Sequence, residues 1–431
     1  MSTLVRTRQI TPPHLSYSIP KSSPIVNRTT VAHKPSNGTS FKSNGLIIID
    51  VPATGFQDKL RTYMSFHSSV DDGTAPRFQS GGMPFLRRLR VSSGRNEEIE
   101  DIAPYNYLEH KMIQAVANDD WVQSYGDILG GYAGTNLQAM AGGKQHCVHL
   151  TLSGLFTSPK YWPLLITDGL RIEMYLDSVA AVTVSNEGMS ADATDYTVKN
   201  VALVVETVDV NATMLNEFKS FVQSGQLQLH VPTYLNTASQ SISGSRENVK
   251  ITEAVRSIKS IWSTLRETAS LNDGAVNSFH SRQFDLESYQ YRFGNRYIPA
   301  QRVECGANGS QQNEGAGGAN ALAELLKSLN TFASVDNGGQ LRQTTATVNG
   351  YSDGQDGGGD GSDNSSNNFI FGQNLDLTPE ADVLSGLDAN RQILDIQLIF
   401  AASPANQLTL DSFIYYDQIV QLDRNALHSI F

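Results

Sequence analysis

His146, Cys147 and His149 stand close together in the sequence, and imidazole and thiolate groups are common ligands of transition metals. Residues 146–152 alternate between polar and apolar types, which predicts a β-strand. Side chains three positions apart on a strand point to opposite faces, so His146 and His149 do not reach the same ion. We therefore expect ordinary strand histidines here and no metal site.

Four aspartates form a second group of candidate ligands, this time for a hard cation: Asp353, Asp356, Asp360 and Asp363. Their order differs from that of an EF-hand, and no glutamate closes the loop. Residues 349–368 also contain six glycines, so this stretch buries too little surface to fold alone. We predict a solvated acidic loop here and a second surface loop at 303–318. The sequence leaves open whether the aspartates bind Ca²⁺.

A run of carboxylates after a run of arginines is the third candidate, because paired carboxylates can act as general acid and base. The arginines are Arg87, Arg88 and Arg90, and the acids are Glu97, Glu98, Glu100 and Asp101. Nothing nearby indicates a substrate pocket, so we interpret the acids as a charged turn after a strand, with salt bridges between subunits. We interpret the arginines as a solvated or inter-subunit charge cluster. Short nucleotide-binding, hydrolase and metalloprotease motifs do not occur in the sequence. We expect no enzymatic activity, no cofactor and no small-molecule substrate.

Strict alternation of polar and apolar residues is the clearest structural signal. In 168–177, Leu170, Ile172, Met174 and Leu176 alternate with polar residues. The same pattern recurs at several other places along the chain, namely at 201–205, 391–400 and 410–422. We expect the last of these to be one long strand. Half-buried strands of this kind build antiparallel sheets.

Apolar residues at helical spacing predict three short helices, at 108–116, 213–225 and 322–332. For the second helix, Asn211 or Thr213 is the expected N-cap and Gly225 the expected stop. Helices and strands do not alternate regularly, which favours an all-β fold of antiparallel sandwiches with short helical insertions. The segment 251–265 fits a helix and a strand equally well by its spacing.

The length of 431 residues fits two domains of moderate size. We predict a first domain at 45–235, a polar connection at 236–248 and a second domain at 249–431. The first residues lack the apolar core of a secretion signal, and no run approaches the roughly 18 apolar residues of a membrane span. The two cysteines are too few for a disulfide framework.

A basic N-terminal arm, residues 1–44, precedes these domains. Residues 1–49 contain six cations and no acid, whereas the whole chain has a net charge of −11. The six cations are Arg6, Arg8, Lys21, Arg28, Lys34 and Lys42. Such an arm can contact an anionic surface or lie under a neighbouring subunit, and a disordered tail explains it equally well. We expect that removing residues 1–43 leaves the fold intact and impairs assembly.

Several stretches resemble the double jelly-roll major capsid proteins of tailless icosahedral DNA viruses, the group that includes adenovirus-like and polinton-like viruses. The resemblance rests on the Tyr-Trp-Pro-Leu-Leu loop at 161–165 with the strand 169–176, and on the segments 196–209, 258–266 and 288–299. These are packing motifs of the fold rather than catalytic motifs. The resemblance also favours a strand in the ambiguous segment 251–265.

The resemblance implies two jelly-roll β-sandwiches side by side, three chains per pseudo-hexagonal capsomer, and an icosahedral shell that encloses the genome. Its implied partners are two further copies of the chain, neighbouring capsomers and minor capsid proteins. The arm would face the interior and meet a neighbouring capsomer, a minor capsid protein, an internal membrane or the genome. The alternative is a carbohydrate-binding or adhesion β-sandwich, such as a spike or lectin-like module. That alternative requires a groove of clustered aromatic residues, whereas Trp121, Trp162 and Trp262 are scattered and more typical of core or interface positions.

Overall fold

A computed structural model describes most of the chain after the N-terminal segment. The described residues are 25–71, 77–78, 82–117, 121, 124, 126, 145–184, 194–224, 227–237, 239–253, 255–272, 278–305, 318–332, 369–377, 384–390, 392–422 and 427–429. The aspartates of 353–363 and most of the loop 303–318 lie outside these residues, so the expectations for them stay predictions. No helix within the described ranges has the length and apolar character needed to cross a membrane.

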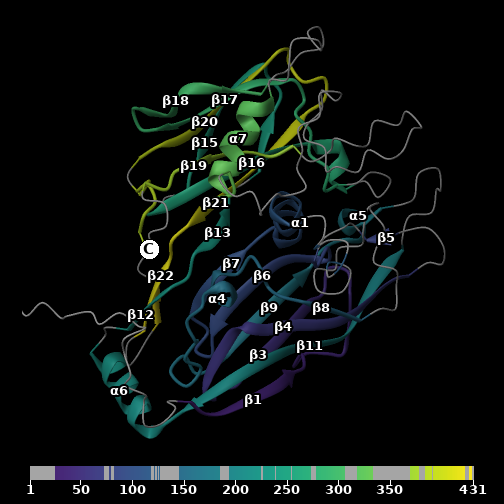
Figure 1. Ribbon diagram of the computed structural model, residues 1–431. Coiled ribbons are helices and arrows are strands. Elements are labelled where there is room, and N and C mark those ends of the chain that lie inside the picture. The colour runs from purple at the N-terminus through teal and green to yellow at the C-terminus, as the bar shows by residue number, and fades with distance from the viewer. Residues whose placement is uncertain are drawn as a thin grey trace, which may run out of the picture.

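Two antiparallel sheets build the first sandwich (Figure 1). The β11 sheet has the order β1-β11-β4-β8, with β2 also paired to β11, and the β9 sheet has the order β3-β9-β6-β7. Their strands are β1 (Ile25–His33), β2 (Ser40–Lys42), β3 (Leu46–Val51), β4 (Phe56–Asp71), β6 (Leu86–Ser93), β7 (Glu98–Ile102), β8 (Gln145–Val148), β9 (Leu170–Leu176) and β11 (Asp195–Val210).

The second sandwich is built in the same way. The β21 sheet has the order β13-β21-β16-β19, with β14 also paired to β21, and the β20 sheet has the order β15-β20-β17-β18. Their strands are β13 (Thr233–Asn236), β14 (Gln240–Ile242), β15 (Arg246–Ile251), β16 (Ile258–Glu267), β17 (Leu286–Phe293), β18 (Arg296–Glu304), β19 (Phe371–Asn374), β20 (Leu394–Phe400) and β21 (Leu408–Tyr416). The strand β16 confirms the expectation for the ambiguous segment.

The two sandwiches have one strand order. We number the eight strands of each sandwich in chain order. β1 and β2 together count as the first strand of the first sandwich, and β13 and β14 together count as the first strand of the second. In each sandwich one sheet is then 1-8-3-6 and the other is 2-7-4-5. Eight antiparallel strands in two interleaved sheets make a jelly roll. The expected all-β fold of two jelly rolls with short helical insertions is therefore present.

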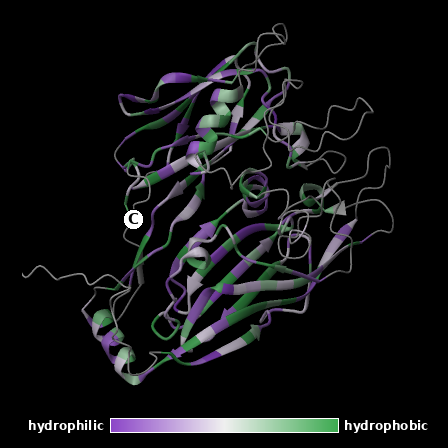
Figure 2. Ribbon diagram, in the orientation of Figure 1, coloured by the Kyte–Doolittle hydropathy of each residue, from purple (hydrophilic) through white to green (hydrophobic). Residues whose placement is uncertain are grey.

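The alternating sequence pattern explains why these strands pair as they do. Along β9, buried and half-buried residues alternate without exception. On this strand Ile172 lies opposite Ile49 of β3 and Val91 of β6, and all three are fully buried. A shift by one residue would turn the charged side of β9 into the core, so this register is strongly fixed. Figure 2 shows hydrophilic and hydrophobic residues interleaved along the strands of both sandwiches.

Short helices and two small sheets complete the fold. The helices are α1 (Tyr105–Val116), α4 (Gly154–Thr157), α5 (Val179–Val182), α6 (Ala212–Gln223), α7 (Gly318–Ser328) and the 3-10 turn η2 (Thr268–Asn272). The small sheets are β5 (Arg77–Phe78) with β10 (Thr183–Val184), and β12 (Leu227–His230) with β22 (Ile419–Leu422) and β23 (Leu427–Ser429). The three predicted helices correspond to α1, α6 and α7. Asn211 caps α6 by accepting a hydrogen bond from the Met214 backbone N–H at 2.9 Å.

Strand pairing differs from the predicted organisation in three places. The polar segment 236–248 contains β14 and the start of β15, because strands at a sheet edge expose alternate residues and so resemble a linker in composition. β12 and β13 pair with β22 and β21, so the second sandwich begins before residue 236. β1 and β2, within the predicted arm, pair with β11 of the first sandwich.

The predicted long strand 410–422 is also interrupted. β21 ends at Tyr416 and β22 begins at Ile419, and β23 follows it. Between them the fully buried Asp417 contacts His230 at 2.6 Å and Lys259 at 3.0 Å. A buried carboxylate needs such partners, because an unpaired buried charge is costly. Burial alone would raise the pKa of Asp417, but hydrogen bonds from His230, Ser257 and Lys259 outweigh it and lower the pKa.

Candidate functional site at the junction of the sandwiches

Helix α1 lies between the two sandwiches (Figure 1) and is buried on nearly all sides. Its Tyr107 hydroxyl donates a hydrogen bond to Thr264 Oγ1 of β16 at 2.9 Å. The guanidinium of Arg266, also on β16, lies 3.9 Å from the centre of the Tyr107 ring. Tyr107 therefore joins the first sandwich to the outward face of the β21 sheet of the second.

Arg266 is held in place by a buried ion pair. Its Nε donates to Oδ2 of Asp411 on β21 at 2.9 Å, and Asp411 is almost fully buried. Burial alone would lower the pKa of Arg266, but the Asp411 carboxylate outweighs it and raises the pKa. A buried pair of this kind fixes geometry more reliably than it adds stability, because desolvation offsets the attraction.

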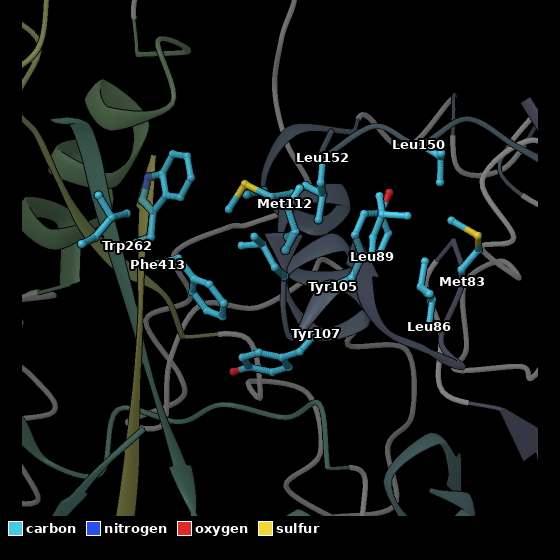
Figure 3. Close-up of a cluster of buried hydrophobic side chains, with 14 of the residues drawn as sticks. Met83, Leu86, Leu89, Tyr105, Tyr107, Met112, Leu150, Leu152, Trp262 and Phe413 are labelled. Carbon is cyan, nitrogen blue, oxygen red and sulfur yellow. The ribbon is translucent and has the colours of Figure 1, made fainter. Parts of the chain in front are cut away.

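Apolar side chains from both sandwiches meet around α1. Figure 3 shows Tyr105 beside Met83, Leu86 and Leu89 of the first sandwich, and Trp262 and Phe413 on the side of the second. All of these residues belong to one continuous buried cluster. The junction is thus packed like a domain core, and the two sandwiches form one rigid unit by the usual standard of apolar interfaces.

Glu109 of α1 is buried within this junction. Its Oε2 accepts a hydrogen bond from the Met83 backbone N–H at 2.9 Å, and Oε1 lies 3.5 Å from the Tyr105 hydroxyl. Burial raises the pKa of Glu109 to about 8. A Cβ on Gly82 would lie 2.7 Å from the carboxylate, so any larger residue there would displace the Glu109 side chain.

A cavity of about 590 Å³ opens beside the junction. Its described lining includes Met112 and Ile113 of α1, and the aromatic rings of Tyr234, Trp262 and Tyr415. Trp262 donates through Nε1 to Ser328 Oγ of α7 at 2.7 Å, so its one polar atom is already bonded. The described lining is mostly apolar and includes no group of residues arranged for acid–base chemistry.

The run of arginines and acids forms a cross-strand ladder on the outward face of the β9 sheet. Arg88 donates to Asp101 at 2.7 Å and Arg90 to Glu98 at 2.8 Å, while Arg90 also lies 3.6 Å from Glu173. These salt bridges join neighbouring strands of one chain. The predicted salt bridges between subunits stay a prediction.

Glu100 differs from its neighbours, and the sequence analysis missed its role. It is buried and accepts hydrogen bonds from the backbone N–H groups of Gly154 and Leu155 at 2.8 and 3.2 Å, at the start of α4. Burial raises its pKa, and the hydrogen bonds only partly offset this. The signal that could have revealed it is the Ser153-Gly154 helix start, whose free N–H groups need an acceptor.

The second sandwich repeats the ladder. Arg292 of β17 donates through Nε to Asp395 of β20 at 2.9 Å, and Asp395 is fully buried. Arg90 lies opposite Glu173, and Arg292 lies opposite Asp395, so both pairs join the fourth and seventh strands of their jelly rolls. The outward faces of the β9 and β20 sheets therefore have a common arginine–carboxylate pair.

The structure describes three of the six cations of the predicted arm. Arg28 lies on β1 and forms ion pairs with Asp58 and Glu206, and Lys42 on β2 lies 3.1 Å from Asp195. Lys34 follows β1 and is exposed. The others, Arg6, Arg8 and Lys21, lie outside the described residues.

β8 ends at Val148, so the strand predicted over 146–152 stops before His149. The buried His146 ring stacks on Phe66, with centroids 5.6 Å apart. His149 Nε2 lies 3.3 Å from the Lys59 carbonyl oxygen. Among the described residues, no group of three or more His, Cys, Asp or Glu side chains is arranged to hold a metal ion.

No protein-family model and no curated protein matches this chain by sequence. Solved structures do match by fold over nearly the whole chain. The first is PBCV-1 VP54, fitted into a reconstruction of the virophage Sputnik, with a TM-score of 0.60 and 11% identity over 96% of this chain and 99% of that chain. The second is the Faustovirus major capsid protein, with a TM-score of 0.53 and 9% identity over 95% and 92%.

The mavirus major capsid protein is a third, with a TM-score of 0.52 and 9% identity over 97% of this chain and 94% of that chain. Each comparison covers both sandwiches and their junction, so the likeness extends to how the two are placed. The chain therefore has the double jelly-roll fold of these viral major capsid proteins, as the sequence resemblance indicated.

Proposed function

We propose that this chain is a structural subunit of a viral capsid, a major capsid protein that works by assembly and not by catalysis. The observation that carries the proposal is the match over nearly the full length, with both sandwiches included, to a Faustovirus and a mavirus major capsid protein. A likeness confined to one sandwich would support only a common module, because jelly rolls serve many functions.

The rigid junction supports this role. A shell must keep its subunits in fixed relative positions, and the α1 junction joins the two sandwiches through Tyr107, the Arg266–Asp411 pair and a shared apolar core. The proposal includes the homotrimer, with six sandwiches in a pseudo-hexagonal capsomer, and contacts with neighbouring capsomers and minor capsid proteins. The virion is then its location.

The basic arm is assigned more narrowly than the sequence suggested. Arg28 and Lys42 have carboxylate partners on their own sandwich, so their charge is already balanced locally. We assign contact with an internal membrane or the genome to Arg6, Arg8, Lys21 and the exposed Lys34. So few cations would bind a nucleic acid weakly and with strong salt dependence.

The carbohydrate-binding alternative is less well supported. Trp162 is fully buried. Trp262 lines the cavity with Tyr234 and Tyr415, but it is only 3% exposed, and these three rings pack on one another. The exposed aromatic residues in the described part of the chain belong to separate elements: Tyr63, Tyr161, Phe221, Tyr297 and Phe332. A sugar site needs aromatic and polar groups that converge on one groove.

Electron microscopy of the chain produced at high concentration in cells tests the proposal. We expect flat hexagonal arrays or closed shells with six-lobed units. A control is Ile172→Asp, which should not fold and should give no ordered assembly. Only dispersed single molecules from the natural chain, at every concentration and salt condition, would contradict the proposal.

A further inference from the structure

The cavity beside the junction has walls from both sandwiches. Met112 and Ile113 of α1 line it from the side of the first sandwich. The rings of Tyr234, Trp262 and Tyr415 line it from the second. In Figure 3, Met112 lies on the side of α1 and Trp262 lies across from it. The volume of about 590 Å³ is within the range of about 300–1,000 Å³ that is usual for small-molecule sites.

The aromatic wall of this cavity is held in one arrangement. The Tyr234 ring lies 4.9 Å from Tyr415 and 5.6 Å from Trp262, centroid to centroid. Trp262 Nε1 donates to Ser328 Oγ at 2.7 Å, which fixes the ring from the side of α7. Gly372 of β19 lies opposite Trp262, and a Cβ there would come within 2.6 Å of the ring. The wall is therefore preformed, and a ligand that packs on it loses little affinity to reordering of the protein.

The described lining of the cavity has no ionised side chain. It includes no Asp, Glu, Lys, Arg or His. Burial raises the pKa of Tyr415 to about 12 and also raises the pKa of Tyr234, so both hydroxyls keep their protons at neutral pH. An ionised ligand would lose its hydration here and gain no opposite charge in return. The cavity therefore favours an uncharged ligand.

Two tyrosine hydroxyls are the polar feature of the aromatic wall. Within the part of the chain that the structure describes, neither the Tyr234 nor the Tyr415 hydroxyl has a hydrogen-bond partner. Tyrosine hydroxyls at buried positions usually have one, because an unpaired polar group away from water is costly. A ligand oxygen that accepts a hydrogen bond would meet this need. The remaining described wall is long and mostly apolar, since the lining residues of α1 extend from Met112 to Ala117, more than one helical turn.

From this combination we infer that the cavity binds an uncharged single-chain lipid, such as a long-chain alcohol or ester. The alkyl chain lies between α1 and the three rings, and the polar end accepts a hydrogen bond from Tyr234 or Tyr415. Each buried methylene adds to the affinity, because apolar surface leaves water. The bound chain contacts both sandwiches and so stabilises their junction. The inference goes beyond the proposed function, because assembly into a shell requires no ligand.

Tryptophan fluorescence tests the inference on the purified chain. The sequence has three tryptophans, of which Trp121 and Trp262 line the cavity and Trp162 is fully buried elsewhere. The probe is bromododecanol, whose bromine atom quenches tryptophan on close contact. We expect saturable quenching that unbrominated dodecanol reverses by competition. Ionised bromododecanoate, which has the same chain and a charged end, should bind at least about 10-fold more weakly.

Two matched substitutions locate the site. Ala117→Phe places a ring in the cavity, and the control Ala32→Phe places the same ring on the exposed edge strand β1. Circular dichroism checks that both variants are folded. We expect Ala117→Phe to weaken bromododecanol binding about 10-fold or more, and Ala32→Phe to bind like the natural chain. Tyr234→Phe keeps the aromatic wall and removes one hydroxyl, so it should weaken binding about 3-fold or more.

Three results would contradict the lipid site and leave the proposed function as it stands. The first is quenching that does not saturate or that dodecanol does not reverse, which decides the matter even if Ala117→Phe does not fold. The second is a folded Ala117→Phe variant that binds as tightly as the natural chain. The third is equal affinity for bromododecanol and bromododecanoate, because it would show that the site does not select an uncharged ligand.

Discussion

The two sandwiches have one strand order but different loop helices. In both, the longest insertion with a helix lies between the fifth and sixth strands, which gives α1 in the first and α7 in the second. α1 leaves its own sandwich and fills the junction, whereas α7 packs mainly on β19 of its own sandwich. The two sandwiches thus share their strand order, and the segments that connect their strands give them different surfaces.

The outward sheet faces differ in the same sense. The β21 sheet has aromatic residues that α1 covers, and the β11 sheet has the exposed Tyr63 between small side chains. One face is therefore part of a core, and the other is exposed in the single chain. The comparison teaches that two sheets with the same strand order become core or surface according to what their connecting segments cover.

The largest expected effect is loss of the fold when a charge is placed at the same position of either sandwich. Ile172 of β9 and Ile396 of β20 are both fully buried on the seventh strand. Ile172→Asp or Ile396→Asp would bury an unpaired carboxylate, which costs on the order of several kcal/mol. Circular dichroism and limited proteolysis should show an unfolded chain in both cases. A soluble variant with cooperative melting would contradict the strand register.

A smaller effect is expected at the junction. Tyr107→Ala removes the hydrogen bond to Thr264, the ring under Arg266 and a large apolar volume. We expect a loss of about 3 kcal/mol or more in the free energy of unfolding. Calorimetry should resolve two transitions, because the sandwiches would no longer unfold together. Tyr161→Ala serves as the control, and a single unchanged transition for Tyr107→Ala would show that α1 does not couple the sandwiches.

The pH dependence of stability tests the buried carboxylate of α1. The pKa of Glu109 is raised to about 8 in the folded chain. Between about pH 4.5 and 8 the folded state keeps a proton that the unfolded state has lost, so stability falls as pH rises, by at most about 1.4 kcal/mol per pH unit. The free energy of unfolding is measured by urea denaturation at pH 5 and at pH 8. Glu109→Gln should reduce the loss of stability between these two pH values, and the exposed Glu217→Gln should not. An equal loss for the natural chain and both variants would refute the raised pKa of Glu109.

The smallest effect concerns α6, which links the sandwiches. Asn211→Ala removes the side chain that accepts from the Met214 N–H, and should lower stability by about 1 kcal/mol. Thr213→Ala is the matched control, since Thr213 lies inside the helix. Chemical denaturation distinguishes the two. A larger loss of stability for Thr213→Ala would show that Thr213, and not Asn211, is the N-cap.

Strand positions could be predicted from the sequence wherever one face of a strand is buried. The alternation around Ile172 specified β9 to within a residue or two, and the resemblance resolved β16. Edge strands such as β14 could not be predicted, since their exposed side chains follow no core pattern. β1 is another edge strand, and removing residues 1–43 would delete it. We therefore expect the fold to tolerate removal of residues 1–24 rather than of residues 1–43. Asp417 could not be predicted, because its partners His230 and Lys259 come from distant segments.

The native mass of the purified chain, with images of single particles, tests the central claim most directly. The account predicts a stable particle of three times the chain mass of 47.0 kDa, with six lobes that correspond to the two sandwiches of each copy. A monodisperse monomer that forms no larger particle at any protein or salt concentration would contradict it.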